Sequence, residues 1–259
     1  MKRIVLIILI CFTGCKKNNQ DEEAIAGDAA ASFKKSIQAM HNKSSWENKD
    51  AVAFDIELIF NGQQRLKARV TSLTNSSKIR LDKSDGTILV FNGEQVFLSP
   101  ADVEVEDAGF DLFAWQYFFA LPFKLNDRGA EMELLGQKSM MGNILYRARL
   151  TVDQNIEDSP NDWYILYQEA DTGLLFAAAY TVTLNKEKLQ AQNDPQAIIY
   201  RNYEVKEGIP VSTRWTFHNW SEEDGFGEEI GEALITNISF LDAEDQIFER
   251  PQNSKVLNN

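Results

Sequence analysis

Histidine and cysteine are scarce in this chain, and their scarcity excludes whole classes of site. The 259 residues include two His and two Cys. Zinc is held mainly by these two residue types, and a Ser–His–acid triad also needs a histidine. Because no Gly-x-Ser-x-Gly motif precedes a predicted helix, a serine nucleophile is not expected. We predict no metal and no cofactor, and a structural role for His218, which faces solvent or bonds to a backbone carbonyl.

Long apolar runs are also missing, with one exception near the N-terminus. Ile4–Ile10 forms an apolar run behind Lys2 and Arg3. It is too short to cross a bilayer as a helix, which needs about 20 apolar residues, and it is typical of an export signal. The run leads to Thr13-Gly14-Cys15, small residues before a cysteine, as in the lipobox of bacterial lipoproteins. We predict a signal peptide over residues 1–14 and acylation of Cys15, for example with palmitate; the alternative is an ordinary secretory signal.

Positively charged residues are fewer than negatively charged ones. The chain has 26 Lys and Arg against 39 Asp and Glu, and loss of Lys2 and Arg3 with the signal would move the net charge from −13 to −15. Such a surface argues against nucleic acid, which is bound by neutralising phosphates, and leaves membrane attachment to acyl chains. The other cysteine, Cys11, lies inside the predicted signal, so the mature chain can form no intrachain disulfide.

Residues 15–31 are polar, acidic or small and read as a flexible tether after the acylated cysteine. The cluster Asp21-Glu22-Glu23 is either a sorting signal for the outer leaflet or a simple aid to solubility. We expect an outer-membrane lipoprotein of the cell envelope, with the periplasmic side favoured over surface exposure.

Residues 32–250 are expected to form one β domain, followed by a tail over residues 251–259. Its first element is expected to be an amphipathic helix over Asp28–Met40, which begins in the tether. Apolar residues alternate from Val52 to Phe60, which is typical of a half-buried strand, and Asn61-Gly62 predicts a tight hairpin turn. Similar runs and turns continue to about Phe240. They predict ten or eleven antiparallel strands joined mainly by tight turns, in an open or closed meander. Several runs, such as Trp163–Tyr167, are apolar on both faces, so both faces of the sheet should be covered.

One segment breaks the β pattern. Phe110–Phe123 carries seven aromatic rings, follows an acidic loop and is ended near its last residue by Pro122. It is expected to be a helix that is apolar on most sides and buried nearly all round. A curled sheet with this helix in its concave side would satisfy that requirement.

Particular strings resemble an uncharacterised bacterial lipoprotein family. Tyr117–Leu125 followed by Asp127-Arg128-Gly129 resembles its aromatic-Leu-Pro-Phe signature, and Ala39–Asn42 with Trp46 resembles its opening, where Asn42 and Lys43 replace two glycines. The resemblance implies a fold similar to the lipoprotein carrier LolA: mainly β with a few helices, a strongly curved antiparallel half-barrel whose concave face is covered by helices. It also implies a binder of hydrophobic ligands and supplies no catalytic residues.

The candidate ligand-binding residues are the rings of the aromatic segment: Trp115, Tyr117, Phe118, Phe119 and Phe123. They either line a cavity for a lipid or lipidated protein, or fill the concave side as ordinary core. We expect a non-enzymatic binding protein. A scaffold or interaction subunit of an envelope assembly is the second hypothesis.

Weaker hypotheses use other residues. The abundant carboxylates leave room for an acid-pair glycan hydrolase. Trp215 and Trp220 could form a sugar-stacking platform, although tryptophan is also common in strands. Two acidic clusters could bind calcium, but neither has the spacing of a calcium loop, and solvated loops are favoured. These are Asp102, Glu104, Glu106 and Asp107, and Glu222-Glu223-Asp224.

Overall fold

The computed structural model describes residues 19–127, 129–152, 163–181 and 195–257. Cys15 and the predicted signal lie outside these residues. The first group of strands is β1 (Ala51–Phe60), β2 (Gln63–Leu73), β3 (Ile79–Lys83), β4 (Ile88–Phe91) and β5 (Val96–Ser99). The second group is β6 (Ala130–Met140), β7 (Asn143–Val152), β8 (Trp163–Glu169), β9 (Leu175–Thr181), β10 (Gln196–Lys206), β11 (Ile209–Ser221), β12 (Gly225–Leu241) and β13 (Lys255–Leu257). The helices are α1 (Asn19–Met40), α2 (Lys43–Glu47), α3 (Ala108–Ala120) and the short 3-10 turns η1 (Leu121–Phe123) and η2 (Asp245–Phe248).

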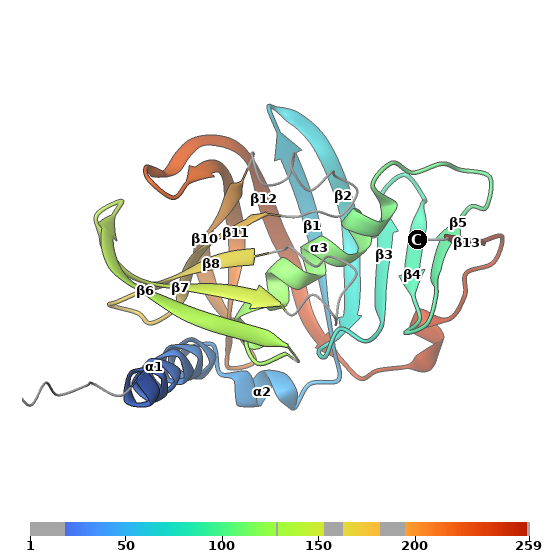
Figure 1. Cartoon of the computed structure of the whole chain (residues 1–259). Helices are drawn as coiled ribbons and strands as arrows, with labels where there is room; N and C mark the ends of the chain where they lie inside the picture. The colour runs from blue at the N-terminus through green and yellow to red at the C-terminus, as the bar shows by residue number, and fades with distance from the viewer. Residues whose placement is uncertain (1–18, 128, 153–162, 182–194, 258–259) are drawn as a thin grey trace, which may run out of the picture.

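All thirteen strands join one antiparallel sheet, in the order β13-β5-β4-β3-β2-β1-β12-β11-β10-β9-β8-β7-β6. The chain builds outward from β1 to β5, crosses to the far edge through α3, and returns from β6 to β12, which pairs with β1. Because α3 connects strands near opposite edges, it must cross a face of the sheet. Figure 1 shows it lying across the inner face.

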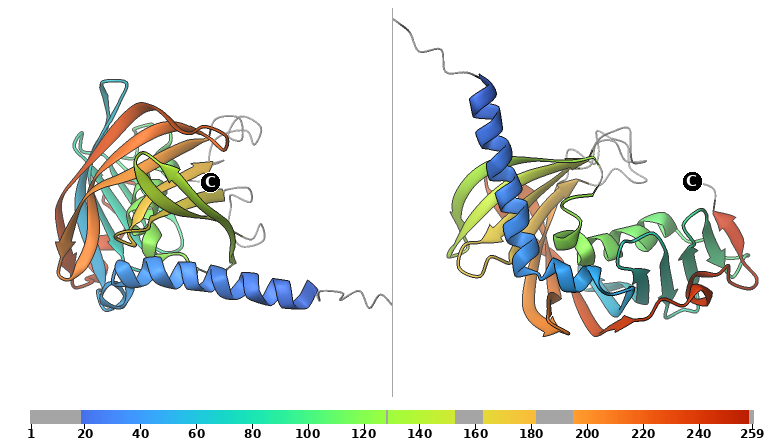
Figure 2. Two further views of the ribbon diagram at one scale, coloured as in Figure 1. Left: turned by 90° about the vertical axis from the view of Figure 1, so that its left-hand side faces the viewer. Right: turned by 90° about the horizontal axis from the view of Figure 1, so that it is seen from below.

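The prediction of a mainly β, antiparallel fold with few helices is confirmed, while the predicted number of strands is too low. The two end strands are not paired with each other, so the sheet is open. It bends around α3 (Figure 2) but is neither closed nor strongly curled, in contrast to the expected strongly curved half-barrel. Apolar residues are nevertheless buried in clusters on both faces of the sheet, as described below.

At both ends of the domain, regular structure extends further than the sequence predicts. Helix α1 begins at Asn19, so residues 19–31 are helical rather than a flexible tether. Ala and Glu have high helix propensity, and acidic residues stabilise a helix N-terminus, which offsets the polar composition. In the predicted tail over residues 251–259, β13 pairs with β5 through Val256 and Phe97. This pairing satisfies backbone groups that an edge strand would leave open.

The turns follow the residues predicted for them. Asn61 and Gly62 both have positive φ, 49° and 74°, as a type I′ hairpin turn requires. Met141 and Gly142 adopt the same geometry, with φ of 50° and 80°, although no turn was predicted there. Methionine seldom adopts positive φ, so its side chain gave no indication of the turn.

Both faces of β8 and β9 are buried, as the apolar run over Trp163–Tyr167 predicts for β8. In β8, Tyr164 and Leu166 belong to the large inner core, whereas Ile165 and Tyr167 belong to a second cluster on the other face. The β11–β12 hairpin closes this second cluster, because the Trp220 Nε1–H donates to the Tyr167 hydroxyl at 2.9 Å. Strands that are apolar on both faces therefore separate two cores.

Candidate functional site

Helix α3 is the central element of the inner face and is apolar on almost every side. Leu112 and Phe118 are buried, while Phe110, Phe113 and Tyr117 are half-buried on the remaining sides. The helix runs directly into η1, where Pro122 is buried. A proline lacks the backbone N–H that would continue the helix, and this explains the stop.

The predicted ligand-binding rings are packed against other rings. Trp115, Phe118, Phe119 and Phe123 are all buried, and Tyr117 is half-buried. Phe119 stacks on Phe54 with ring centroids 4.2 Å apart, and Phe123 stacks on Trp46 at 4.1 Å. In this conformation the rings contribute to the inner core.

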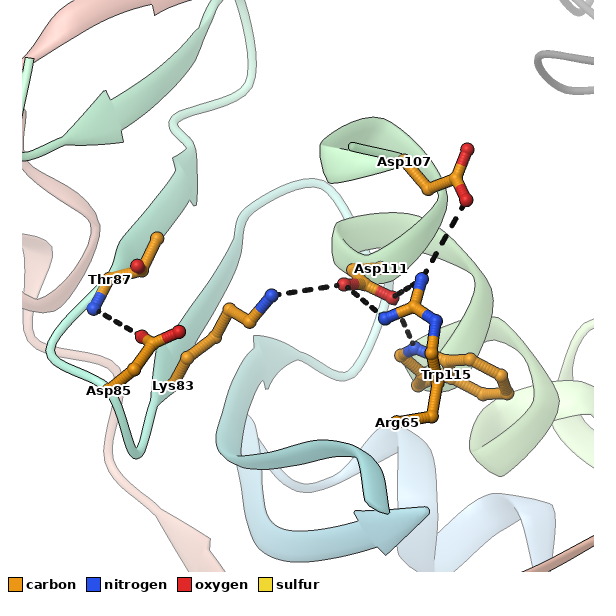
Figure 3. A network of polar contacts seen from close by, with 7 residues as sticks. All are labelled: Arg65, Lys83, Asp85, Thr87, Asp107, Asp111 and Trp115. Carbon is orange, nitrogen blue, oxygen red and sulfur yellow. Dashed lines mark hydrogen bonds and ion pairs between the residues drawn. The ribbon is translucent and has the colours of Figure 1, made fainter. Parts of the chain in front are cut away.

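A buried carboxylate fixes the N-terminal half of α3 to the sheet. Asp111 is fully buried, and Arg65 of β2 and Lys83 of β3 lie 3.2 and 3.3 Å from its oxygens. The Trp115 Nε1–H donates to the same carboxylate at 3.3 Å, and Arg65 also lies 3.8 Å from Asp107. Figure 3 shows these groups converging on Asp111. A buried charge is costly unless it is paired, so this cluster holds the helix in one register.

The C-terminal end of α3 has a second tie to the sheet. The Tyr200 hydroxyl, on β10, donates to the backbone carbonyl of Phe118 at 3.0 Å. Burial raises the pKa of Tyr200 well above its ordinary value, so the hydroxyl keeps its proton. Between this tie and the Asp111 cluster, the buried amide of Gln116 donates to the hydroxyl of Ser76, and apolar contacts surround it.

A small pocket lies beside η1, where η1 approaches β10 and β11. Its volume is about 10 Å³, which is room for about one water molecule. The lining residues are His41, Phe119, Pro122, Phe123, Tyr200, Tyr203, Pro210, Val211, Ser212 and Trp215. Two predicted site residues, Phe119 and Phe123, therefore border the pocket, while Trp115, Tyr117 and Phe118 do not.

His41 is fixed in this pocket by two backbone contacts. Its Nε2 accepts the N–H of Leu175 at 3.1 Å, so Nδ1 carries the proton and donates to the carbonyl of Pro210 at 3.3 Å. Burial lowers the pKa of His41 to about 4, and the hydrogen bond to Pro210 opposes this shift only partly. The ring is neutral near pH 7 and links the end of α1 to β9 and β11.

The pocket does not provide the chemistry of the weaker hypotheses. No Asp or Glu lines it, so it offers no acid pair. Trp215 belongs to the inner core and Trp220 to the cluster on the other face, so they form no common sugar platform. In the described part of the chain, no three His, Cys, Asp or Glu side chains converge as metal ligands.

His218 has the structural role that was predicted. It is buried in β11 and its Nδ1 lies 3.0 Å from the carbonyl of Gly227. In the acidic loop, Glu104 pairs with Lys255 of β13 at 2.6 Å. Within the described ranges, no helix has both the length and the apolar character needed to cross a membrane.

Several residues of the pocket were not among the predicted ligand-binding residues. Trp215 was considered for a sugar-stacking platform or as an ordinary strand residue, and Tyr200 and Tyr203 were read as strand residues. The spacing of these two tyrosines in the sequence gives no sign of the irregularity between them. Asn202 has φ of 51° and is missing from the pairing with β11, although the register is the same on both sides of it. The irregularity brings both tyrosines to the pocket although they are three positions apart.

Comparison with solved structures identifies the fold. The chain is similar to a LolA superfamily protein from Nitrosomonas europaea, with 13% identity and a TM-score of 0.53 over 83% of this chain and 97% of that one. It is also similar to an outer membrane lipoprotein-sorting protein domain from Vibrio parahaemolyticus, with 9% identity and a TM-score of 0.51 over 85% and 97%. No family model and no curated protein matches the chain. At these identities the likeness establishes the fold alone, and that fold is LolA-like, as the resemblance implied.

Proposed function

We propose that this protein is a non-enzymatic lipoprotein of the cell envelope, anchored through an acylated Cys15, that binds a hydrophobic ligand between the α3–η1 segment and the inner face of the sheet. The observation that carries the proposal is the pocket beneath η1, which has Phe119 and Phe123 on its wall. The LolA-like fold supports it, because one protein with this fold is described as an outer membrane lipoprotein-sorting protein domain. The ligand class is a lipid or the lipid part of a lipidated protein.

The pocket must widen to admit such a ligand. Moving Phe119 and Phe123 away would break their stacking on Phe54 and Trp46, and each aromatic pair contributes about 0.5–1.5 kcal/mol. Each buried methylene of a ligand contributes about 0.8 kcal/mol. Two to four methylenes would therefore offset the lost stacking, by this order-of-magnitude reckoning, and a full acyl chain would exceed it.

The domain organisation belongs to the same proposal. Residues 1–14 are a lipoprotein signal peptide, and Cys15 is the first residue of the mature chain. Helix α1 begins at Asn19. Its C-terminal half packs against the rest of the domain through the buried residues Ala30, Phe33 and Ile37. A protein anchored in this way receives or senses a ligand at a membrane rather than carrying it across an aqueous gap. The membrane is the outer one, with the domain in the periplasm.

Native mass spectrometry tests this proposal. The full chain with Cys15→Ser is purified from a bacterial envelope without detergent, and co-purifying lipid is extracted with solvent. We expect a reproducible bound lipid. Val211→Phe fills the pocket and should reduce lipid occupancy at least fivefold, whereas Val205→Phe, the same change at a 68% exposed position on the neighbouring strand, should not. A lipid-free protein that also fails to take up added fatty acid or apolar dye would reject the proposal.

A second role is favoured by the tight packing of the rings. Because Phe119 and Phe123 already stack on other rings, the inner face can be stable without a ligand. In that case the protein is a scaffold or interaction subunit of an envelope assembly. Pull-down with the full chain would then recover a defined protein partner whose binding is unchanged by Val211→Phe.

A further inference from the structure

The polar groups of the pocket are the starting point, because nearly all of their hydrogens are already used. The Tyr203 hydroxyl donates to the carbonyl of Leu175 at 2.6 Å, and the Ser212 hydroxyl donates to the carbonyl of Arg201 at 2.6 Å. Tyr200 and His41 donate to backbone carbonyls as described above. These four groups position the walls and have no hydrogen left for a ligand.

Trp215 differs from these four residues. Its side chain is 1% exposed and lines the pocket, and its Nε1–H has no hydrogen-bond partner among the described residues. Three other indoles are satisfied: Trp46 donates to a backbone carbonyl, Trp115 to a carboxylate and Trp220 to a hydroxyl. A buried donor without an acceptor costs about 1–3 kcal/mol. Among the described residues that line the pocket, Trp215 is therefore the one whose side-chain donor lacks an acceptor.

The size and charge of the pocket restrict that acceptor. A volume of about 10 Å³ holds a single oxygen atom rather than a phosphate or a sugar ring. No Lys, Arg, Asp or Glu lines it. An anionic headgroup would lose its hydration here without gaining a counter-charge, which is costly. A neutral oxygen attached to an apolar chain satisfies both restrictions.

We propose that the pocket binds the carbonyl oxygen of a neutral acyl ester or amide, with the Trp215 Nε1–H as its donor and the attached chain lying under η1. This inference rests on the proposed function and names the ligand class of the same site. The carbonyl end of the ligand enters the pocket first, and the methylenes follow as Phe119 and Phe123 move aside. Trp215 thus selects acyl esters and amides over plain hydrocarbons.

Indole NMR of the full chain with Cys15→Ser tests the proposal directly. The probes are methyl laurate, which has an ester carbonyl, and dodecane, which has no acceptor. Methyl laurate should move the Trp215 indole N–H proton downfield, while dodecane should not. Trp215→Phe identifies the resonance by its loss. The Trp220 indole proton, already bonded on the other face of the sheet, is the internal control and should not move with either probe.

Affinity measurements provide the second readout. Trp215→Phe keeps an aromatic ring and removes the N–H, so it should weaken methyl laurate binding about fivefold, the worth of about one hydrogen bond, and leave dodecane binding unchanged. Trp220→Phe should change neither affinity. If Trp215→Phe does not fold, the NMR response of the protein that retains Trp215 decides the question.

Three outcomes would overturn the inference. Equal affinity for methyl laurate and dodecane would reject the carbonyl site while leaving hydrophobic binding intact. A Trp215 proton that stays in place when methyl laurate binds would show that its acceptor is an internal water. If neither probe binds, the proposed function and this ligand class are both rejected.

Discussion

The two faces of the sheet differ in how their cores are closed. On the inner face, the separate segment α3–η1 covers the strands, and beside it remains a pocket lined by Trp215, whose indole N–H has no partner among the described residues. On the other face, the β11–β12 hairpin supplies Trp220 and Phe226 directly to the cluster around Tyr167, and the indole of Trp220 is satisfied. The second cluster is closed by strands that cannot leave without breaking the sheet. The inner core is closed by a separate segment, α3–η1, with a pocket beside it, so we place ligand binding there.

The largest expected effect comes from removing a ring at the centre of the inner core. Phe118→Ala should destabilise the protein by about 4 kcal/mol, because Phe118 is 1% exposed and its loss leaves a cavity. Urea unfolding measures the change. Phe113→Ala, on the half-buried side of the same helix, should cost less than half as much. If both variants lost the same free energy of unfolding, the two sides of α3 would contribute equally to stability, which would contradict this prediction.

The Asp111 cluster is expected to hold α3 almost as strongly. Asp111→Asn should cost about 3 kcal/mol, because Lys83 and Arg65 lose the buried charge that they neutralise. Asp245→Asn is the control: it removes the partner of Lys78, and Asp245 is 91% exposed, so the change should be small. Two equally small effects in urea unfolding would show that the cluster does not fix the helix.

Stability should depend on pH through His41. Its pKa falls from 6.5 in the unfolded chain to about 4 in the folded protein, so the unfolded chain binds the additional proton between these values. The contribution of neutral His41 to the free energy of unfolding is therefore complete above pH 6.5. It is lost as the pH falls from 6.5 towards 4. Between pH 7 and pH 4.5 the loss should be about 2.5 kcal/mol.

The variant His41→Gln isolates this contribution. Glutamine can accept the N–H of Leu175 but does not titrate, so the variant should lose about 2.5 kcal/mol less than the unchanged chain over the same pH interval. Urea unfolding at both pH values measures the difference. Identical pH profiles for the two proteins would contradict the burial of a neutral His41.

The smallest predicted effect concerns the face opposite α3. Trp220→Phe removes one hydrogen bond to Tyr167 and should cost about 1 kcal/mol, with no effect on ligand binding. Trp215→Phe should show the reverse pattern, a small stability change and altered ligand preference. If the two variants behave alike in both measurements, the distinction between the faces is wrong.

Local patterns in the sequence predicted much of the fold. Alternation from Val52 to Phe60 gave a strand, Asn61-Gly62 gave its turn, and the aromatic run gave α3 with its stop near Pro122. These features depend on residues close in the sequence, whose backbone preferences act locally. The pairing of β13 with β5 was missed, because three residues of a polar tail carry little signal of their own.

The candidate site was predictable only in part. Phe119 and Phe123 were found because an aromatic run is visible in the sequence. The rest of the pocket lining was not found. His41, for example, bonds to Leu175, which lies 134 positions away in the chain. Trp215 was considered for a sugar-stacking platform or as an ordinary strand residue. Only the inner-face packing shows that it is buried and that its N–H has no partner in the described part of the chain. Contacts of this kind depend on the tertiary fold rather than on local pattern.

Photo-crosslinking of the full chain tests the central claim most directly. A diazirine-bearing acyl methyl ester is added to the protein with Cys15→Ser, irradiated, and the adducts are located by peptide mass spectrometry. We predict adducts on residues 119–123 and 209–215, competed by methyl laurate and reduced by Val211→Phe. Adducts confined to residues 220–226 on the other face, or no adduct at all, would contradict ligand binding beneath η1.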